Sequence, residues 1–136
     1  MRSTPGLAVS ALSWPHAAAV ALGGGAGALL RWLAGVWLNP LAAPLALGTL
    51  AVNLLGGLMI GMSLVWFARM PDEFLRLLLV TGLLGGLTTF SAFSAESLSL
   101  LLRGQWGWAA AHTLLHVAGS LVAAGLGWHI GRWLWA

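Results

Sequence analysis

Long apolar runs separated by short polar segments dominate the pattern of this sequence. Four such runs cover residues 16–38, 45–68, 74–102 and 106–135. The segments between them carry the prolines, charges and amides that usually interrupt helices. At about 1.5 Å per residue, even the shortest run extends about 35 Å, which is enough to cross a bilayer. The pattern therefore predicts an all-α membrane protein with four transmembrane helices in a single domain.

The third run contains a stretch that a membrane helix accommodates poorly, GLLGGLTT at residues 82–89. Its three glycines lower helix propensity, and the hydroxyls of its two threonines compete for backbone partners. Backbone that leaves a helix at membrane depth must be buried in protein or line a polar cavity. The stretch is either a broken helix with a function or a poorly formed helix. The polar residues of the other runs favour a functional break in the middle of the third span.

Composition strengthens the membrane prediction. Of the 136 residues, 60% are apolar and 7% are charged, and the mean hydropathy is +0.92. Soluble domains are about 25% charged. The six basic residues are all arginines, so the net charge of +3 reflects few charges rather than a nucleic-acid-binding patch. The absence of cysteine from the sequence excludes disulfides, thiol catalysis and thiolate metal sites.

The arginines are distributed unevenly between the two sides of the predicted helices. The side that holds the termini and the second loop carries Arg2, Arg69, Arg76 and Arg132, and the other side carries Arg103 and, near its surface, Arg31. Cytoplasmic loops are generally richer in basic residues. The bias therefore favours cytoplasmic termini, but it is weak enough to permit insertion in both orientations.

Small and polar residues recur every four positions in the first two runs and so share one helix face. The sets are Gly23, Gly27, Arg31 and Gly35 in the first run, and Thr49, Asn53, Gly57 and Gly61 in the second. Small residues at this spacing allow another helix backbone to approach closely. Arg31 either faces protein or water, or snorkels to the surface. Asn53 either makes an interhelical hydrogen bond or donates to an ion path.

The third run carries aromatic and acidic residues beyond the glycines. Phe90 and Phe93 are three residues apart and share a face, which suits ordinary core packing as well as a functional pair. Glu96 is the only acid clearly inside a run. A proton relay, a cation ligand and a hydrogen-bonded neutral carboxyl are all open for it.

The fourth run repeats the four-residue spacing with His112, His116 and Ser120. Two histidines at this spacing on a helix can bind a metal ion. No acidic or thiol ligand is close to them in the sequence, so polar lining or interhelical hydrogen bonding is favoured. Because four helices are too few to enclose a hydrated path, the polar faces predict a homo-oligomer, most simply a two-fold dimer. If the chain inserts both ways, the two helix breaks meet near the midplane.

Three segments resemble the signatures of the Fluc/CrcB fluoride channels. They are GGGAGALLR at 23–31, GTLAVNLLG at 48–56 and GLLGGLTTFSAFS at 82–94, in family order. The resemblance implies an antiparallel, dual-topology homodimer in the bacterial inner (plasma) membrane that exports fluoride passively and lowers its toxicity. It also implies a structural sodium ion at the dimer centre, lipid around the dimer, no nucleic-acid partner, and a channel rather than an enzyme.

The same resemblance assigns roles to residues by their position in the motifs. It assigns the fluoride pathway to Asn53, Phe90, Phe93, Thr49, Ser91, Ser120, His116 and Glu96. It places Arg31 in a vestibule, and it assigns the sodium ion to the backbone carbonyls of Gly85 and Thr88. The histidine at 116 is a departure, because some relatives have a small hydroxyl residue at this position.

Two other classes of function compete with a fluoride channel. A proton-coupled exporter of cationic compounds typically needs a membrane carboxylate in its first span, where this chain has Arg31. A packing subunit without transport leaves Asn53, Glu96 and the broken helix unexplained. An enzyme is disfavoured because the sequence shows no paired carboxylates and no nucleophile with a base.

Overall fold

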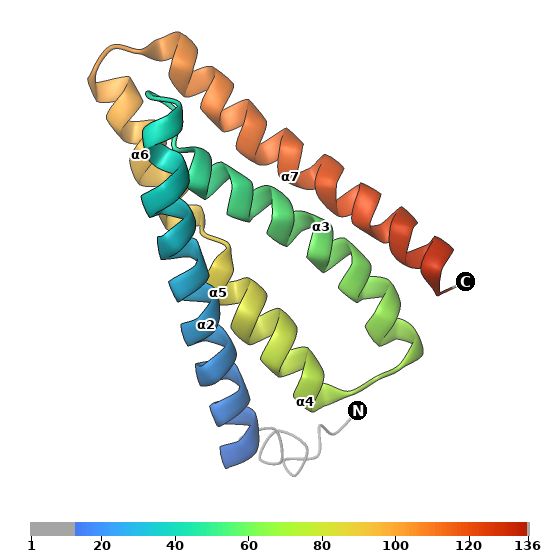
Figure 1. Cartoon of the computed structure of the whole chain (residues 1–136). Helices are drawn as coiled ribbons and strands as arrows, with labels where there is room; N and C mark the ends of the chain where they lie inside the picture. The colour runs from blue at the N-terminus through green and yellow to red at the C-terminus, as the bar shows by residue number, and fades with distance from the viewer. Residues whose placement is uncertain (1–12, 136) are drawn as a thin grey trace, which may run out of the picture.

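A computed structural model describes residues 13–135 as four long helices joined by short connections (Figure 1). The helices are Trp14–Leu41, Leu47–Arg69, Glu73–Leu102 and Trp106–Leu134, and each is long and apolar enough to cross a membrane. This finding confirms the predicted all-helical chain with four spans. The observed ends lie within three residues of the apolar runs.

The spans differ in regularity. The first is α2 (Trp14–Leu38), extended by the short 3₁₀ turn η1 (Asn39–Leu41), and the second is α3 (Leu47–Arg69). The third is divided into α4 (Glu73–Arg76), the π-helical η2 (Leu77–Leu84), α5 (Gly85–Leu87) and α6 (Phe90–Leu102), and the fourth is α7 (Trp106–Leu134). Asp72 begins the third span as a cap, since its carboxylate accepts a 2.9 Å hydrogen bond from the Leu75 amide.

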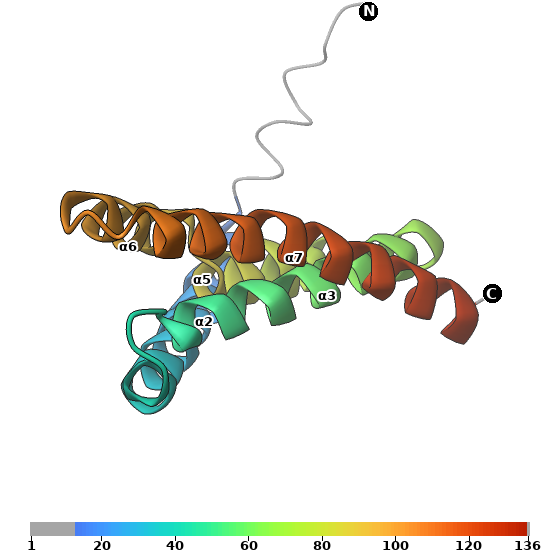
Figure 2. The same ribbon diagram turned by 90° about the horizontal axis from the view of Figure 1, so that it is seen from above.

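The two halves of the third span pack on different neighbouring helices. α3 and α7 share the most extensive contact and run side by side (Figures 1 and 2). α2 packs instead on η2 and α5, whereas α6 packs on α7. The chain thus passes from one neighbour to another between α5 and α6, and the helix break lies at this point.

Glycines allow the closest helix contacts. A Cβ atom on Gly27 of α2 would collide with the backbone carbonyl of Leu83, and one on Gly86 would collide with that of Gly24. A Cβ atom on Gly61 would likewise collide with the Ala124 carbonyl, so this glycine permits the close contact between α3 and α7. Close approach of this kind is the usual role of small residues between membrane helices. Gly23 and Gly27 of the first-span stripe therefore pack against the third span, whereas Gly35 lies against Gly48 of α3.

The break consists of two residues. Thr88 (φ −83°, ψ 154°) and Thr89 (φ −153°, ψ 125°) are extended, and the helix resumes at Phe90. Thr89 is the N-cap of α6, because its Oγ1 accepts a 3.1 Å hydrogen bond from the Ala92 amide. Gly82 and Gly85 are helical, so the break lies C-terminal to the glycines, whereas the predicted stretch of 82–89 began at Gly82.

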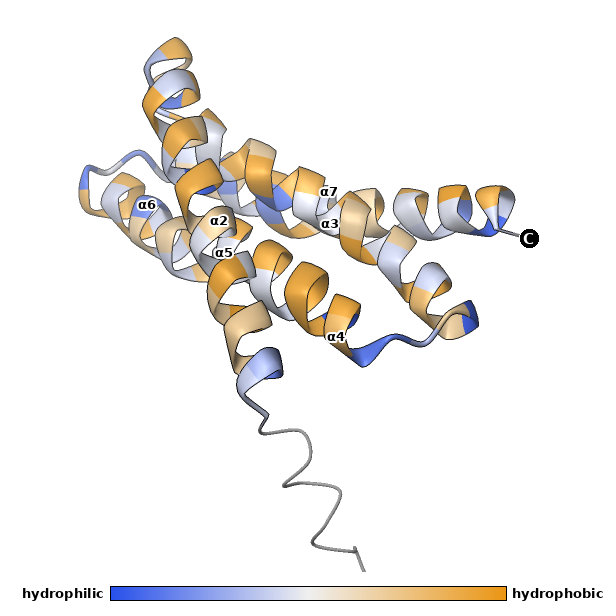
Figure 3. Ribbon diagram, turned by 60° about the horizontal axis from the view of Figure 1, so that its bottom comes forward, coloured by the Kyte–Doolittle hydropathy of each residue, from blue (hydrophilic) through white to orange (hydrophobic). Residues whose placement is uncertain are grey.

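Many large apolar side chains are exposed along the spans, whereas several polar side chains are buried. Hydrophobic positions predominate along the spans, and hydrophilic positions mark the connections between them (Figure 3). Leu22 and Leu121 are 72% and 70% exposed, whereas Thr49, His112 and His116 are at most 7% exposed. Polar groups inside and apolar groups outside are the arrangement that a bilayer requires. The chain thus has the architecture of a multi-pass membrane protein.

Candidate functional site

An open groove of about 590 Å³ lies beside the helix break, between α3, the third span and α7. It gathers polar, backbone and aromatic groups from parts of the chain that are far apart in sequence. Among its lining residues are Asn53, Gly85, Thr88, Phe90, Phe93, His116 and Ser120. The structure therefore brings seven of the eleven predicted site residues together. The other four, Arg31, Thr49, Ser91 and Glu96, do not line the groove.

The Asn53 side chain makes two hydrogen bonds to the backbone of Thr89 at the break, and this pair of bonds is called the clamp. Asn53 Nδ2 donates to the Thr89 carbonyl at 3.0 Å, and Asn53 Oδ1 accepts from the Thr89 amide at 2.8 Å. One side chain thus satisfies both backbone groups of an extended residue, as a neighbouring β-strand would. This pairing allows irregular backbone at a depth where water is scarce. The interhelical hydrogen bond considered for Asn53 is present, and Asn53 also lines the groove.

The same clamp fixes the tautomer of His116. Asn53 Nδ2 lies 3.1 Å from His116 Nδ1, and the amide cannot be flipped without losing both bonds to Thr89. His116 Nδ1 therefore accepts, and a neutral ring carries its proton on Nε2. Within residues 13–135 this Nε2 is buried without a hydrogen-bond partner. His116 thus has a preformed, buried N–H donor beside the groove that lacks an acceptor.

Two carbonyls at the break lose their helical donors. In a continuous helix the Thr89 amide would bond the Gly85 carbonyl, but it donates to Asn53 instead. The Ala92 amide would bond the Thr88 carbonyl, but it donates to Thr89 Oγ1. The carbonyls of Gly85 and Thr88 are those that the family resemblance assigns to a sodium ion, and carbonyl oxygens are suitable ligands for hard cations.

Arg31 stabilises the backbone that directly precedes the break, where α5 faces α2. Its Nε donates to the Gly86 carbonyl at 3.1 Å, so this carbonyl is satisfied by a charged group. A charge-assisted hydrogen bond of this kind is stronger than a neutral one. The arginine faces protein, which was one of its predicted alternatives, and it joins α2 to α5.

The two phenylalanines differ in exposure. Phe90 is 77% exposed and Phe93 is 8% exposed, although their ring centroids are only 5.3 Å apart. Phe93 stacks on His112 with centroids 5.5 Å apart and an interplanar angle of 8°, and it also contacts His116 at 5.0 Å. Phe93 thus links the groove to the histidines of α7, whereas Phe90 lies on the surface of the chain.

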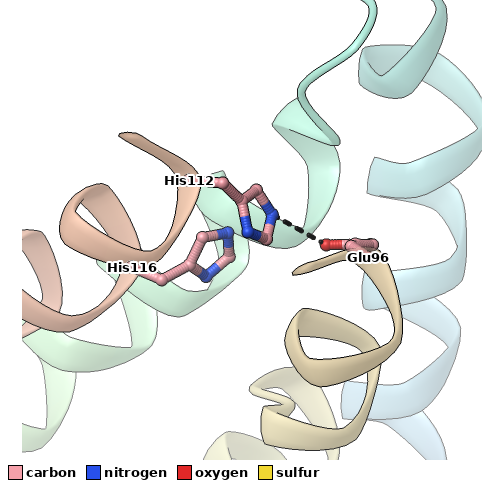
Figure 4. Close-up of side chains that lie close together, drawn as sticks. All are labelled: Glu96, His112 and His116. Atoms are coloured by element: carbon pink, nitrogen blue, oxygen red, sulfur yellow. Dashed lines mark hydrogen bonds and ion pairs between the residues drawn. The ribbon is translucent and has the colours of Figure 1, made fainter. Parts of the chain in front are cut away.

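A second polar cluster lies next to the groove (Figure 4). Glu96 Oε1 accepts a 2.6 Å hydrogen bond from Thr49 Oγ1, and Glu96 Oε2 lies 3.2 Å from His112 Nε2. His112 Nδ1 lies 3.0 Å from Ser97 Oγ. The His112 and His116 ring centroids are 4.4 Å apart, so the cluster is continuous with the groove. Thr49 and Glu96, which do not line the groove, are therefore connected to it through the two histidines.

Sequence reasoning missed some members of these sites. Thr89 supplies the cap and both clamp bonds, and Ser97 orients His112, yet neither was a predicted site residue. The threonine pair was a visible signal for the first, whereas no local pattern marks the second. Ser91 lies outside the groove, where its Oγ is 3.1 Å from Thr89 Oγ1.

Comparisons with known proteins agree on one family. A family model described as "CrcB-like protein, Camphor Resistance (CrcB)" matches residues 18–128. A "Fluoride-specific ion channel FluC" from Aromatoleum aromaticum is 53% identical over 121 residues, which cover 88% of this chain and 92% of that protein. Proteins of the same name from Thiobacillus denitrificans and Pseudomonas aeruginosa are 50% and 48% identical, over 85% and 89% of this chain and 95% and 97% of theirs.

Proposed function

The chain belongs to the CrcB family, and from this premise we propose that it is a fluoride-specific ion channel. Its relatives are channels and not enzymes. The observation that best supports conduction of a small anion is the groove at the helix break. There, the N–H donor of His116 and the hydroxyl of Ser120 lie near two phenylalanine rings.

The chemistry of the groove suits fluoride. A small, strongly hydrated anion gives up its water only where other donors replace it, and it leaves again only where no fixed charge holds it tightly. His116 Nε2–H and the Ser120 hydroxyl are neutral donors of this kind. The edges of Phe90 and Phe93 carry the positive part of the ring quadrupole and can face an anion. Asn53 positions the donor on His116 rather than offering a free one, because its own Nδ2 already has two partners.

The proposed transport is passive export from the cytoplasm across the bacterial inner membrane, which lowers fluoride toxicity. Thr49, Glu96 and Ser91 extend the polar path beyond the groove, and Arg31 lies at its vestibule. A passive path needs no proton-exchanging group. Both oxygens of Glu96 have hydrogen-bond partners, which suits a carboxyl that orients its neighbours.

The proposed channel is an antiparallel homodimer with dual topology. An open groove and a phenylalanine that is 77% exposed are features that a second copy would cover. The proposed structural sodium ion lies at the centre of this dimer, where the Gly85 and Thr88 carbonyls of two chains would converge. These carbonyls lack helical donors within each chain, which supports their use as cation ligands.

Fluoride conduction is tested with purified protein in liposomes loaded with potassium fluoride. Adding a potassium ionophore should release fluoride rapidly, as measured with a fluoride electrode, whereas chloride-loaded liposomes should release little chloride. Equal efflux of both ions, or of neither, would contradict the proposal. Phe90→Ala should abolish fluoride efflux while the dimer stays intact on size-exclusion chromatography. Leu22→Ala, which changes a residue that is 72% exposed and does not line the groove, serves as a matched control and should conduct.

A further inference from the structure

Glu96, His112 and His116 form a cluster of metal-ligating side chains on two helices (Figure 4). One ligand atom from each residue lies within 4.8 Å of the other two. His112 and His116 are one turn apart on α7, and Glu96 faces them from α6. The sequence argument against a metal site was that no acid lies near these histidines, and the fold supplies one.

The outer contacts leave one free atom on each of the three residues. Thr49 occupies Glu96 Oε1, Ser97 occupies His112 Nδ1 and Asn53 occupies His116 Nδ1. The atoms left for a ligand are Glu96 Oε2, which already lies 3.2 Å from His112 Nε2, and the Nε2 of His116. In metal sites, a ligating histidine typically donates its second ring N–H and a ligating carboxylate is itself hydrogen-bonded. Glu96 and His112 have partners suited to this arrangement, whereas Asn53 donates to His116 Nδ1.

His116 supplies independent evidence for a ligand. Its side chain is only 4% exposed, and its Nε2 has no hydrogen-bond partner within the described residues. Figure 4 shows the ring directed toward His112 and Glu96. A buried polar atom without a partner is unfavourable, so a group that binds it is favoured. That group is an acceptor in the tautomer that Asn53 selects, or a metal ion once the ring proton has moved to Nδ1.

We propose that Glu96, His112 and His116 bind a divalent transition-metal ion, with Zn²⁺ as the best match. Two imidazoles and one carboxylate with an open fourth position form a common zinc ligand set. Magnesium and calcium ions are poor matches for this site, because they prefer oxygen ligands and two of the three side chains offer nitrogen. Zinc bonds of about 2.0–2.1 Å place ligand atoms roughly 3.3 Å apart, so the cluster needs only small side-chain rotations.

Metal binding has a predictable consequence for the clamp at the break. For His116 Nε2 to bind zinc, the ring proton must reside on Nδ1, where it faces the Nδ2 of Asn53. The hydrogen bond between Asn53 and His116 is then lost. Zinc therefore removes the free N–H donor of His116 and places a positive ion beside the groove. On the premise of the proposed function, a bound zinc ion would inhibit fluoride efflux.

Binding is measured first, because it does not depend on transport. Equilibrium dialysis of the purified full-length protein should find one Zn²⁺ per chain, with X-ray absorption showing nitrogen and oxygen ligands at about 2.0–2.2 Å. His116→Ser and His112→Gln should each weaken binding by at least about tenfold. His129→Gln changes an exposed histidine on the same helix and should bind zinc as the unchanged protein does. Undiminished binding in His116→Ser and His112→Gln would overturn the proposal.

Inhibition is measured second, in the fluoride-efflux assay. Zinc should slow efflux at least about tenfold for the unchanged protein and for His129→Gln, and the same concentration of magnesium should not. The His116→Ser variant, whatever its own rate, should have the same efflux with and without zinc. Equal inhibition of this variant would overturn the site. Absence of efflux without any metal would instead contradict the channel function and leave the binding result standing.

Discussion

Asn53 connects the backbone of the break to the polar chemistry of the groove. One amide satisfies the N–H and the carbonyl of Thr89 and also selects the tautomer of His116. The extended residues at 88 and 89 are therefore tolerated in a membrane span because a neighbouring helix supplies the partners that the span gave up. At the scale of single residues, the break and the donor it presents depend on the same side chain.

The importance of this clamp is tested with Asn53→Leu, which keeps the approximate volume and removes both polar atoms. Leaving the Thr89 backbone groups buried without partners should lower the free energy of unfolding by about 1–3 kcal/mol and abolish fluoride efflux. Stability is measured by denaturant unfolding in detergent. Ser63→Ala is the matched control, because it removes a 2.7 Å hydrogen bond within the same helix, far from the break. Equal stability of the two variants would show that Asn53 is not a structural clamp.

Sequence periodicity predicted which residues share a face but not which faces meet. The spacing of four placed His112 with His116, and Thr49 with Asn53, because helix geometry alone determines these relations. It could not place Glu96 against His112, since that contact depends on how α6 and α7 cross. The metal-ligand cluster was therefore rejected for lack of an acid, although the acid lies on the preceding helix.

At the scale of elements, the third span shows how glycine and threonine divide their roles. Low helix propensity led to the prediction that the glycines open the helix. The glycines remain helical because their lack of a side chain permits the close approach of α2, which outweighs the weak propensity. The helix ends instead at Thr88, whose Oγ1 donates to the Leu84 carbonyl at 2.8 Å, and Thr89 begins the next helix as a cap.

Two neighbouring glycines should therefore respond differently to the same change. Gly86→Ala would collide with the Gly24 backbone and should destabilise the chain by about 1–3 kcal/mol. Gly85→Ala would meet nothing closer than the Val80 carbonyl at 3.7 Å, so the single chain should fold normally. If Gly85 lies at a sodium site between two chains, its variant should lose the dimer on size-exclusion chromatography with light scattering. A stable Gly85→Ala dimer that is indifferent to sodium would contradict that site.

At the scale of the whole molecule, one chain leaves functional groups uncovered. Phe90 is mostly exposed, the groove at the break is open, and the carbonyls of Gly85 and Thr88 lack helical donors. The sequence predicted four spans and the need for a partner, because composition and polar faces are visible without coordinates. The orientation of the partner depends on insertion, and the weak arginine bias permits both orientations.

Dual topology is tested with Met70→Cys, which places the only thiol of the chain on an exposed residue between α3 and α4. A membrane-impermeant thiol reagent applied to intact spheroplasts should modify about half of the molecules, and the rest should react only after permeabilisation. Half modification follows because the four arginines of one side and the one or two of the other give little preference between orientations. Modification of all or none of the thiols in intact cells would establish a single orientation. An antiparallel dimer cannot form from chains that all insert the same way, so this result would also exclude the proposed sodium site between two inverted breaks.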